Sequence, residues 1–195
     1  MQKKSATALN RLSSEAYELA PKLPFRVVLD NVRSRHNIGA VFRTADAYRV
    51  DEIELCGICC CPPNDEIHKT ALGAEQTVHW RYWNNTLDAV AALRQEGYKV
   101  YAVEQAFGSI TLDNFTESCR KSIESQSKVN PSLPETSSNR IAVVFGHEVF
   151  GVSQEVIDAC DGCIELEQYG TKHSLNVSVT AGIVIYNIAK IYERV

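Results

Sequence analysis

The segment Arg140-Ile141-Ala142-Val143-Val144-Phe145-Gly146 decides the fold class of this chain. Five consecutive apolar residues, from Ile141 to Phe145, predict a β-strand that is covered on both faces. Strands of this kind occur in parallel sheets, because the connections between parallel strands place helices on both sides of the sheet. The rest of the chain alternates short apolar runs with helical patterns. The sequence therefore predicts an α/β domain with a mostly parallel sheet and helices on both faces.

The remaining elements follow from apolar periodicity and from the residues that begin or end helices. Further strands are expected at residues 25–29, 52–56, 78–83, 99–104 and 162–166, and helices at 6–19, 38–48, 66–72, 85–95, 153–160 and 178–193. Residues 116–139 are rich in Ser, Asn, Pro, Lys and Glu, so they are expected to form a flexible surface insertion. We expect residues 1–24 to be a short N-terminal helical extension and residues 25–195 to be one domain.

Composition is ordinary for a globular protein: 195 residues, 45% hydrophobic and 23% charged, with a net charge of −4. No apolar run approaches the roughly 20 residues that span a bilayer, and the N-terminus lacks a signal-peptide core, so we expect a cytoplasmic protein without a membrane partner. Negative net charge argues against non-specific coating of nucleic acid. A local basic patch is still possible, and a solvated basic face is the alternative. The candidate arginines are Arg26, Arg33, Arg35, Arg43 and Arg49.

Seven cysteines include two Cys-x-x-Cys pairs, Cys56/Cys59 and Cys160/Cys163. The two pairs lie too far apart in sequence for a zinc ribbon. Cys56 and Cys59 also lie at the end of a predicted strand, where alternation points them to opposite faces. We therefore expect reduced, buried thiols rather than a metal site, and the odd number argues against a complete disulfide framework.

Residues 31–44 join the first strand to a helix that is expected to begin near Asn37. Backbone N–H groups and the helix dipole would point at this loop. Arg43 follows six residues later, and a guanidinium beside a helix N-terminus can hold a phosphate or a sugar. A capping asparagine and a surface arginine without any binding role would give the same pattern.

Two more segments carry residues that suit ligand binding. In residues 145–153, Gly146 lets a ligand approach the backbone at the carboxyl end of the buried strand, where open α/β sheets bind ligands. Glu148 follows it, although a favourable charge at a helix N-terminus would explain that residue equally. In residues 166–182, Ser174 and Asn176 flank Leu175 just before the last helix, which Ser178 could cap.

Together these segments resemble the SpoU (TrmH-type) family of SPOUT-class RNA methyltransferases. The family's Asn-x-x-x-x-x-Arg segment is matched by Asn37 and Arg43, and its Ser-Leu-Asn-Val-Ser run is matched in full by residues 174–178. The Gly-x-Glu-x-x-Gly segment is matched by Gly146, Glu148 and Gly151. The order and the separations agree, so the resemblance extends from about residue 25 to the C-terminus.

The resemblance implies an S-adenosylmethionine-dependent enzyme that methylates a ribose 2'-hydroxyl of RNA, with tRNA expected ahead of rRNA. It also implies a C-terminal trefoil knot, a homodimer with active sites drawn from both subunits, and no metal. The backbone around Val103, Gly146, Leu166 and Leu175 would hold the adenosyl part of the cofactor. The catalytic set would be Asn37, Arg43, Glu148, Ser174 and Asn176, and the RNA-binding set Arg33, Arg35 and Arg43.

Two departures from the family pattern bear on this expectation. Glu167 stands where the family usually has proline after the last strand, which adds a charge beside the expected cofactor loop. Only about 24 residues precede the first strand, so we expect the core itself to recognise the RNA.

Two other functions are considered. A knotted RNA-binding module without catalysis is disfavoured because all five candidate catalytic residues are present. A dinucleotide-dependent enzyme is disfavoured because no Gly-x-Gly-x-x-Gly follows an early strand. For the methyltransferase, Arg43 is expected to stay protonated and to act as an electrostatic clamp on a phosphate and on the developing alkoxide. A phosphate oxygen or a water molecule would then receive the proton.

Overall fold

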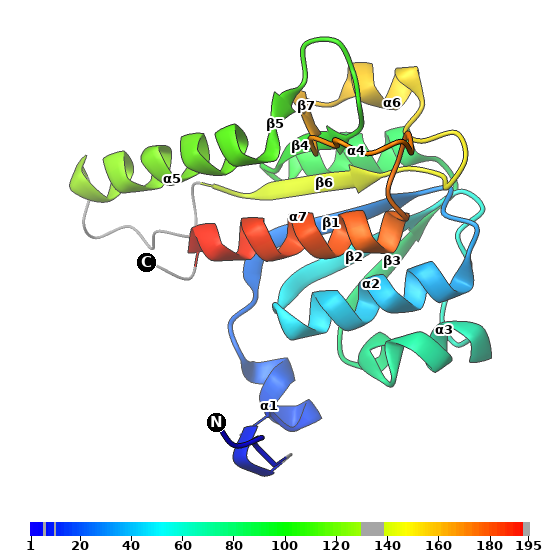
Figure 1. Ribbon diagram of the computed structural model, residues 1–195, viewed down its shortest axis with the longest axis vertical. Helices are drawn as coiled ribbons and strands as arrows, with labels where there is room; N and C mark the ends of the chain where they lie inside the picture. The colour runs from blue at the N-terminus through cyan, green and yellow to red at the C-terminus, as the bar shows by residue number, and fades with distance from the viewer. Residues whose placement is uncertain (6, 10, 130–138, 193–195) are drawn as a thin grey trace.

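A computed structural model describes residues 1–5, 7–9, 11–129 and 139–192, and it contains a seven-stranded sheet (Figure 1). The predicted buried strand is β6 (Ile141–Phe145), which lies between β1 (Leu23–Asp30) and β4 (Lys99–Val103). The strand order is β3-β2-β1-β6-β4-β7-β5, and every neighbouring pair is parallel. The predicted fold class, a parallel sheet with helices, is confirmed.

Alternate side chains of β6 enter two different hydrophobic cores. Val143 and Phe145 pack in the larger core, and Val144 packs in the smaller one. The larger core lies under α2 (Arg35–Ala47), α3 (Asp65–Ala71), α5 (Leu112–Val129) and α7 (Val177–Tyr192), and the smaller core lies under α4 (Thr86–Gln95) and α6 (Gln154–Ala159). The other strands are β2 (Val50–Cys56), β3 (His79–Trp83), β5 (Ile110–Thr111) and β7 (Gly162–Glu165). Figure 1 shows these two helical layers on opposite faces of the sheet.

The strand order places three strand ends beside one another. Strands β2 and β3 lie on one side of β1. Strand β6 lies on the other side of β1, and β4 lies beyond β6. The carboxyl ends of β4, β6 and β7 consequently meet at one edge of the sheet. Ligands of open α/β sheets bind at such a reversal of strand order, so this edge is the place to look for a site.

The N-terminal helix is shorter than predicted. In place of a continuous helix over residues 6–19, there is a 3-10 turn at Thr7–Leu9 and a short helix α1 at Ser14–Leu19. The backbone of Ser13 is extended, and its side chain accepts a hydrogen bond from the Ala16 N–H, 3.2 Å away. Ser13 is thus an N-cap, which starts α1 well after the predicted position. No helix in the described ranges is long and apolar enough to cross a membrane.

The expectation of a flexible insertion at 116–139 is wrong for residues 116–129, which belong to α5. Phe115, Thr116 and Ile123 are buried, and the ring of Phe115 packs edge-on against Tyr101 at a centroid distance of 4.7 Å. A few apolar residues at helical spacing therefore hold a helix whose surrounding sequence is polar. The rest of the predicted insertion, residues 130–138, lies outside the described residues.

Helices α2 and α3 pack closely because Gly39 has no side chain. A Cβ atom at Gly39 would lie 2.3 Å from the Ile67 carbonyl oxygen and 2.2 Å from the Thr70 hydroxyl. The carbonyl belongs to the backbone of α3, so it cannot rotate away. The position of α2, and of the loop that leads into it, depends on this contact.

Replacing Gly39 with alanine should therefore destabilise the protein by about 1–3 kcal/mol, since the added methyl group overpacks the α2–α3 contact. Urea denaturation followed by circular dichroism measures this change. Gly170 is the control, because no atom lies within 4 Å of the position that its Cβ would take and its φ is not positive. Gly170→Ala should change the stability by no more than about 0.5 kcal/mol. Equal stability of Gly39→Ala and the natural protein would contradict the steric argument.

Candidate active site

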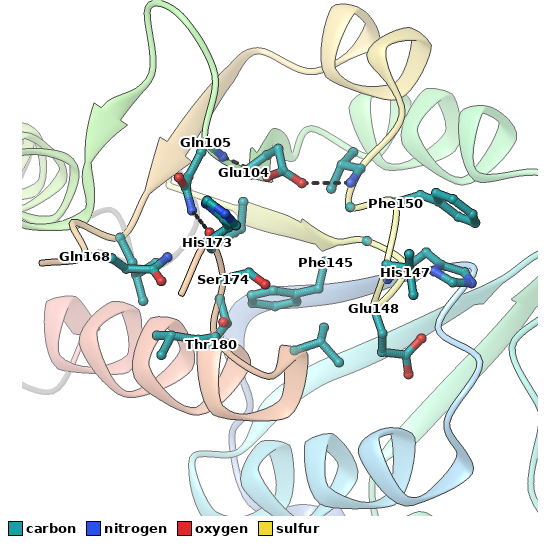
Figure 2. A pocket seen from close by; sticks show the side chains of 18 residues that line it. Glu104, Gln105, Phe145, His147, Glu148, Phe150, Gln168, His173, Ser174 and Thr180 are labelled. Carbon is teal, nitrogen blue, oxygen red and sulfur yellow. Dashed lines mark hydrogen bonds between the residues drawn. The ribbon is translucent and has the colours of Figure 1, made fainter. Parts of the chain in front are cut away.

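A cavity of about 430 Å³ lies at the carboxyl ends of β4, β6 and β7 (Figure 2). This volume is in the usual range for small-molecule sites. All four residues expected to hold the cofactor line it: Val103, Gly146, Leu166 and Leu175. Each lies at or close to the end of a strand or the start of a helix, so the fold brings together residues up to 72 positions apart (103 to 175).

Gly146 is required for a different reason from the one expected. A Cβ atom there would lie 2.1 Å from the carbonyl carbon of Gly151, so the missing side chain admits protein backbone rather than a ligand. His147 and Gly151 pair in a tight hairpin, with N–H to O distances of 3.1 Å and 2.8 Å. Gly151 has a φ of 66°, which favours glycine. The Gly-x-Glu-x-x-Gly segment is therefore a hairpin that closes on itself.

Glu104 holds this hairpin to β4, and the sequence analysis did not single it out. Its Oε2 accepts a hydrogen bond from the Val152 N–H at 3.0 Å, and its Oε1 accepts one from the Gln105 N–H at 2.9 Å (Figure 2). A charged residue directly after a buried strand was the signal that could have identified it.

Gln105 connects the same wall of the cavity to the last loop. Its side-chain amide donates a hydrogen bond to the carbonyl oxygen of His173, 2.6 Å away (Figure 2). Ser174 follows His173 and lines the cavity, and its hydroxyl forms no hydrogen bond within the described part of the chain. The hydroxyl of Ser174 is thus available to a ligand.

Glu148 is the centre of a hydrogen-bonded set at the edge of the cavity. Its carboxylate accepts from the backbone N–H groups of Arg33, at 3.0 Å, and Ser34, at 2.8 Å. The Asn37 side-chain amide donates to the same carboxylate at 2.9 Å, and Asn176 donates to the Asn37 Oδ1 at 3.2 Å. Three of the five residues expected to be catalytic are therefore in direct contact, although they come from three segments far apart in the sequence.

Two helix caps differ from those expected. Helix α2 begins at Arg35, and its N-cap is Ser34, whose hydroxyl accepts from the Asn37 N–H. Asn37 therefore lies in the first turn, where its side chain is free to reach Glu148. At the start of α7 the cap is Asn176 rather than Ser178, because the Asn176 Oδ1 accepts from the Ser178 N–H at 2.8 Å.

The SpoU rRNA Methylase family matches residues 24–186 of the 195 in this chain. The chain belongs to this family. It is 29% identical over 174 residues to a tRNA (guanosine(18)-2'-O)-methyltransferase of Thermus thermophilus, covering 86% of this chain and 78% of that one. It is 30% identical over 187 residues to the 23S rRNA (guanosine-2'-O-)-methyltransferase RlmB of Vibrio cholerae, covering 96% of this chain and 67% of that one.

The fold is also similar to that of a solved rRNA methyltransferase. The AdoMet-bound rRNA methyltransferase from Sinorhizobium meliloti superposes with a TM-score of 0.69 at 24% identity, over 89% of this chain and 59% of that chain. The family resemblance that the three motifs predicted is confirmed by these findings.

The arginines of this SpoU-family chain do not form one basic patch. Arg26 points into an acidic cluster, where it pairs with Asp51 at 2.9 Å and Glu96 at 2.6 Å, so the expectation that it could contribute to a surface patch is wrong. Arg35 is exposed but pairs with Glu66 at 3.0 Å.

Of the five candidate arginines, Arg33, Arg43 and Arg49 are exposed and form no ion pair among the described residues. Arg43 also does not line the cavity. Among the described contacts, Arg43 takes no part in the hydrogen-bonded set of Asn37, Glu148 and Asn176, although all four belong to the expected catalytic set.

Cys56 and Cys59 are divided between the two cores as expected, although not by strand alternation, because β2 ends at Cys56. Cys56 packs in the smaller core and Cys59 in the larger one, so the two thiols of this pair lie on opposite sides of the sheet. The Cys59 thiol donates to the carbonyl oxygen of Leu29 at 3.2 Å, and burial raises its pKa to about 12. All seven cysteines are free thiols.

The carboxyl group of Glu148 has a lowered pKa. Partial burial raises the pKa, but the N–H groups of Ser34 and Arg33 and the amide of Asn37 outweigh this effect by binding the charged form. A lowered pKa in the folded chain means that the carboxylate stabilises the fold above its unfolded pKa of about 4.3. That contribution is lost as the pH falls through the folded pKa.

Glu148→Gln should accordingly lower the free energy of unfolding at pH 7 by about 1–3 kcal/mol, because an amide group presents a donor to one of the backbone N–H groups. The difference from the natural protein should begin to close below about pH 4, and chemical denaturation at pH 7 and pH 3 measures it. Glu124→Gln, an exposed position on α5, should show no such difference at either pH. If the difference in the free energy of unfolding between Glu148→Gln and the natural protein were the same at both pH values, the charge of Glu148 would not be what stabilises the fold.

Proposed function

We propose that the cavity at β4, β6 and β7 holds S-adenosylmethionine and that RNA is methylated beside it, with tRNA the first substrate to test. As a member of the SpoU family, the chain is an RNA 2'-O-ribose methyltransferase with S-adenosylmethionine as its cofactor. The observation that carries the proposal is the contact of Asn37, Glu148 and Asn176 at the cavity edge. It joins all three sequence motifs at a single site.

The residues of the cavity fit the cofactor. Its wall includes Val103, Phe145 and Leu166, which suit an adenine ring, and backbone groups at the strand ends, which suit the polar atoms of a nucleoside. Leu175 and the unpaired Ser174 hydroxyl close the other side. When bound, the cofactor supplies an electrophilic methyl group on a positively charged sulfur. Glu167 is exposed beside this loop and places a carboxylate where the family usually has proline.

The protein's contribution to the reaction is alignment and charge stabilisation. Holding the ribose hydroxyl in line with the methyl donor can lower the barrier by about 7–11 kcal/mol at best. We assign this alignment to the loops that Asn37, Glu148 and Asn176 fix in place. Arg43 stays protonated, so it acts as a clamp on a phosphate and on the developing alkoxide, and a phosphate oxygen or water takes the proton.

A homodimer is part of the proposal, with a knotted C-terminal segment like that of the family. Val179, Ile183 and Tyr186 are exposed along one side of α7, at helical spacing. Tyr186 also packs edge-on against Tyr48, which follows α2, at a centroid distance of 5.8 Å. A second subunit on this apolar stripe would cover it, and would lie beside α2, which carries Arg43. Pairing of subunits therefore explains how Arg43 reaches a cavity that it does not line within one chain.

The choice of substrate is based on the relatives of this chain. Of the two relatives described above, one is named for tRNA and the other for 23S rRNA. The relative named for tRNA is matched over the larger share of its own length, which supports testing tRNA first. We also propose that the protein acts in the cytoplasm, where both RNAs are available.

Incubating the protein with methyl-labelled S-adenosylmethionine and either bulk tRNA or bulk rRNA tests the function directly. Label should enter ribose 2'-O positions, which alkaline hydrolysis and mass spectrometry locate. RNA binding without label transfer would instead support the catalytically inactive module. Thermal stabilisation by S-adenosylhomocysteine, but not by NAD, should accompany activity.

Arg43→Ala should reduce methyl transfer by about 10²–10³-fold, because the charge that stabilises the alkoxide is removed. Cofactor affinity measured by calorimetry should be largely kept, since Arg43 does not line the cavity. Arg94→Ala, at an exposed position on α4 on the other face of the sheet, is the control and should retain activity. A collapse of cofactor affinity in Arg43→Ala would show that the residue is structural.

Val179→Glu should convert a dimer into monomers, since it places a charge in the apolar stripe. Light scattering after size-exclusion chromatography measures the mass. Methylation should fall together with dimerisation. The control is Leu19→Glu, at an exposed leucine of α1 outside the stripe, which should leave the mass unchanged. A natural protein that is monomeric and fully active would contradict the proposed dimer.

A further inference from the structure

We propose that Phe150 and His147 form a stacking platform for a nucleobase of the RNA substrate, next to the cofactor cavity. This inference rests on the proposed methyltransferase function and adds to it a base-binding site. Both residues belong to the hairpin between Gly146 and Gly151, and both line the mouth of the cavity. Figure 2 shows their rings directed outward, away from Gln168, His173 and Ser174 on the opposite wall.

The platform is apolar, aromatic and open to solvent. Phe150 is 82% exposed, and its ring lies 4.9 Å from the His147 ring with an interplanar angle of 37°. Val149, between them in sequence, is exposed as well. Proteins bind unpaired bases of RNA by stacking them on exposed aromatic and histidine rings of this kind.

Hydrogen bonds fix the backbone of the hairpin and the ring of His147. Its ends are joined by the two His147–Gly151 backbone hydrogen bonds, and the Val149 N–H donates to the His147 Nδ1 at 3.0 Å. Because Nδ1 accepts this bond, the neutral imidazole carries its proton on Nε2. Nε2 is then a donor for an acceptor atom on a base edge or a ribose.

The loop that carries Arg33 contacts the hairpin. Glu148, in the middle of the hairpin, accepts from the backbone N–H of Arg33, so the two segments are in contact. The Arg33 side chain is exposed and forms no ion pair with any residue that the structure describes. An exposed guanidinium on a loop that contacts the hairpin suits a nucleotide, with the phosphate bound by the arginine and the base stacked on the rings.

An RNA base fits this surface better than a second subunit does. The apolar stripe that suits a subunit lies on α7, whereas the hairpin mixes its rings with a carboxylate and a free arginine. The hairpin also borders the cavity in which the methyl donor would be held. A base stacked on Phe150 would therefore belong to the target nucleotide or to its neighbour in the strand.

Steady-state methylation of bulk tRNA and bulk rRNA by Phe150→Ala tests the platform. The KM for whichever RNA the natural protein methylates should rise at least about fivefold, the loss expected for one stacked base. The affinity for S-adenosylhomocysteine should not change, and Phe150→Tyr should keep a KM close to that of the natural protein. The control is Phe107→Ala, which removes an exposed phenylalanine that does not line the cavity. It should leave the KM unchanged.

Fluorescence of Phe150→Trp gives a readout that is specific for stacking. Adding the methylated RNA species should quench the new indole, and Phe107→Trp should show no quenching. An unchanged KM in Phe150→Ala, or an unquenched indole at position 150, would overturn the platform. Dissociation of Phe150→Ala into monomers would overturn it too, by showing that Phe150 is a subunit contact. If the natural protein itself methylates no RNA, the proposed function fails, and the same quenching measurement on bound RNA still decides whether the platform exists.

Discussion

The carboxylate of Glu148 is the group on which the arrangement of the site depends. It accepts two backbone N–H groups from the loop before α2 and a third bond from the Asn37 side chain. Ser34 is the N-cap of α2, where N–H groups have no intrahelical partner, and a buried donor without a partner is costly. One side chain therefore satisfies the start of α2 and also ties α2 to the hairpin after β6. Asn176 adds the start of α7 to the same set.

The parallel sheet makes this arrangement possible. Parallel strands all end at one edge, so the loops that follow β1, β4, β6 and β7 are gathered there whatever their separation in sequence. Within that edge, hydrogen bonds of polar side chains fix the distances. Glu104 fixes the hairpin to β4, and Gln105 fixes the last loop to the same strand end. The walls of the cavity are mostly loops, and hydrogen bonds of Glu104 and Gln105 join these loops to one another.

Much of the fold could be predicted from the sequence because its signals are local. The unbroken apolar run of β6 predicted a parallel sheet, and Asn85 and Ser153 marked the starts of α4 and α6 correctly. The prediction of a flexible insertion failed in α5. The composition there is polar, but a few buried apolar residues, Phe115 and Ile123 among them, are enough to hold the helix against the core. The sequence motifs predicted which segments form the site, but not the hydrogen bonds between them. Glu104 stood out only as a charged residue after a buried strand, and neither its contact nor that of Gln105 could be predicted, because their partners, Val152 and His173, lie 48 and 68 residues away.

Some positions of the hairpin between Gly146 and Gly151 are constrained by contacts, and others are free to change. Gly146 and Gly151 are fixed by contacts that leave no room for a Cβ atom, so the number of residues between them is fixed as well. Glu148 points toward α2 and is needed there. The side chains at positions 149 and 150 point into solvent and make no contact on which the backbone depends. Those two positions can therefore be exchanged as a cassette, which would allow an engineer to change which nucleotides the enzyme prefers without rebuilding the loop that carries them.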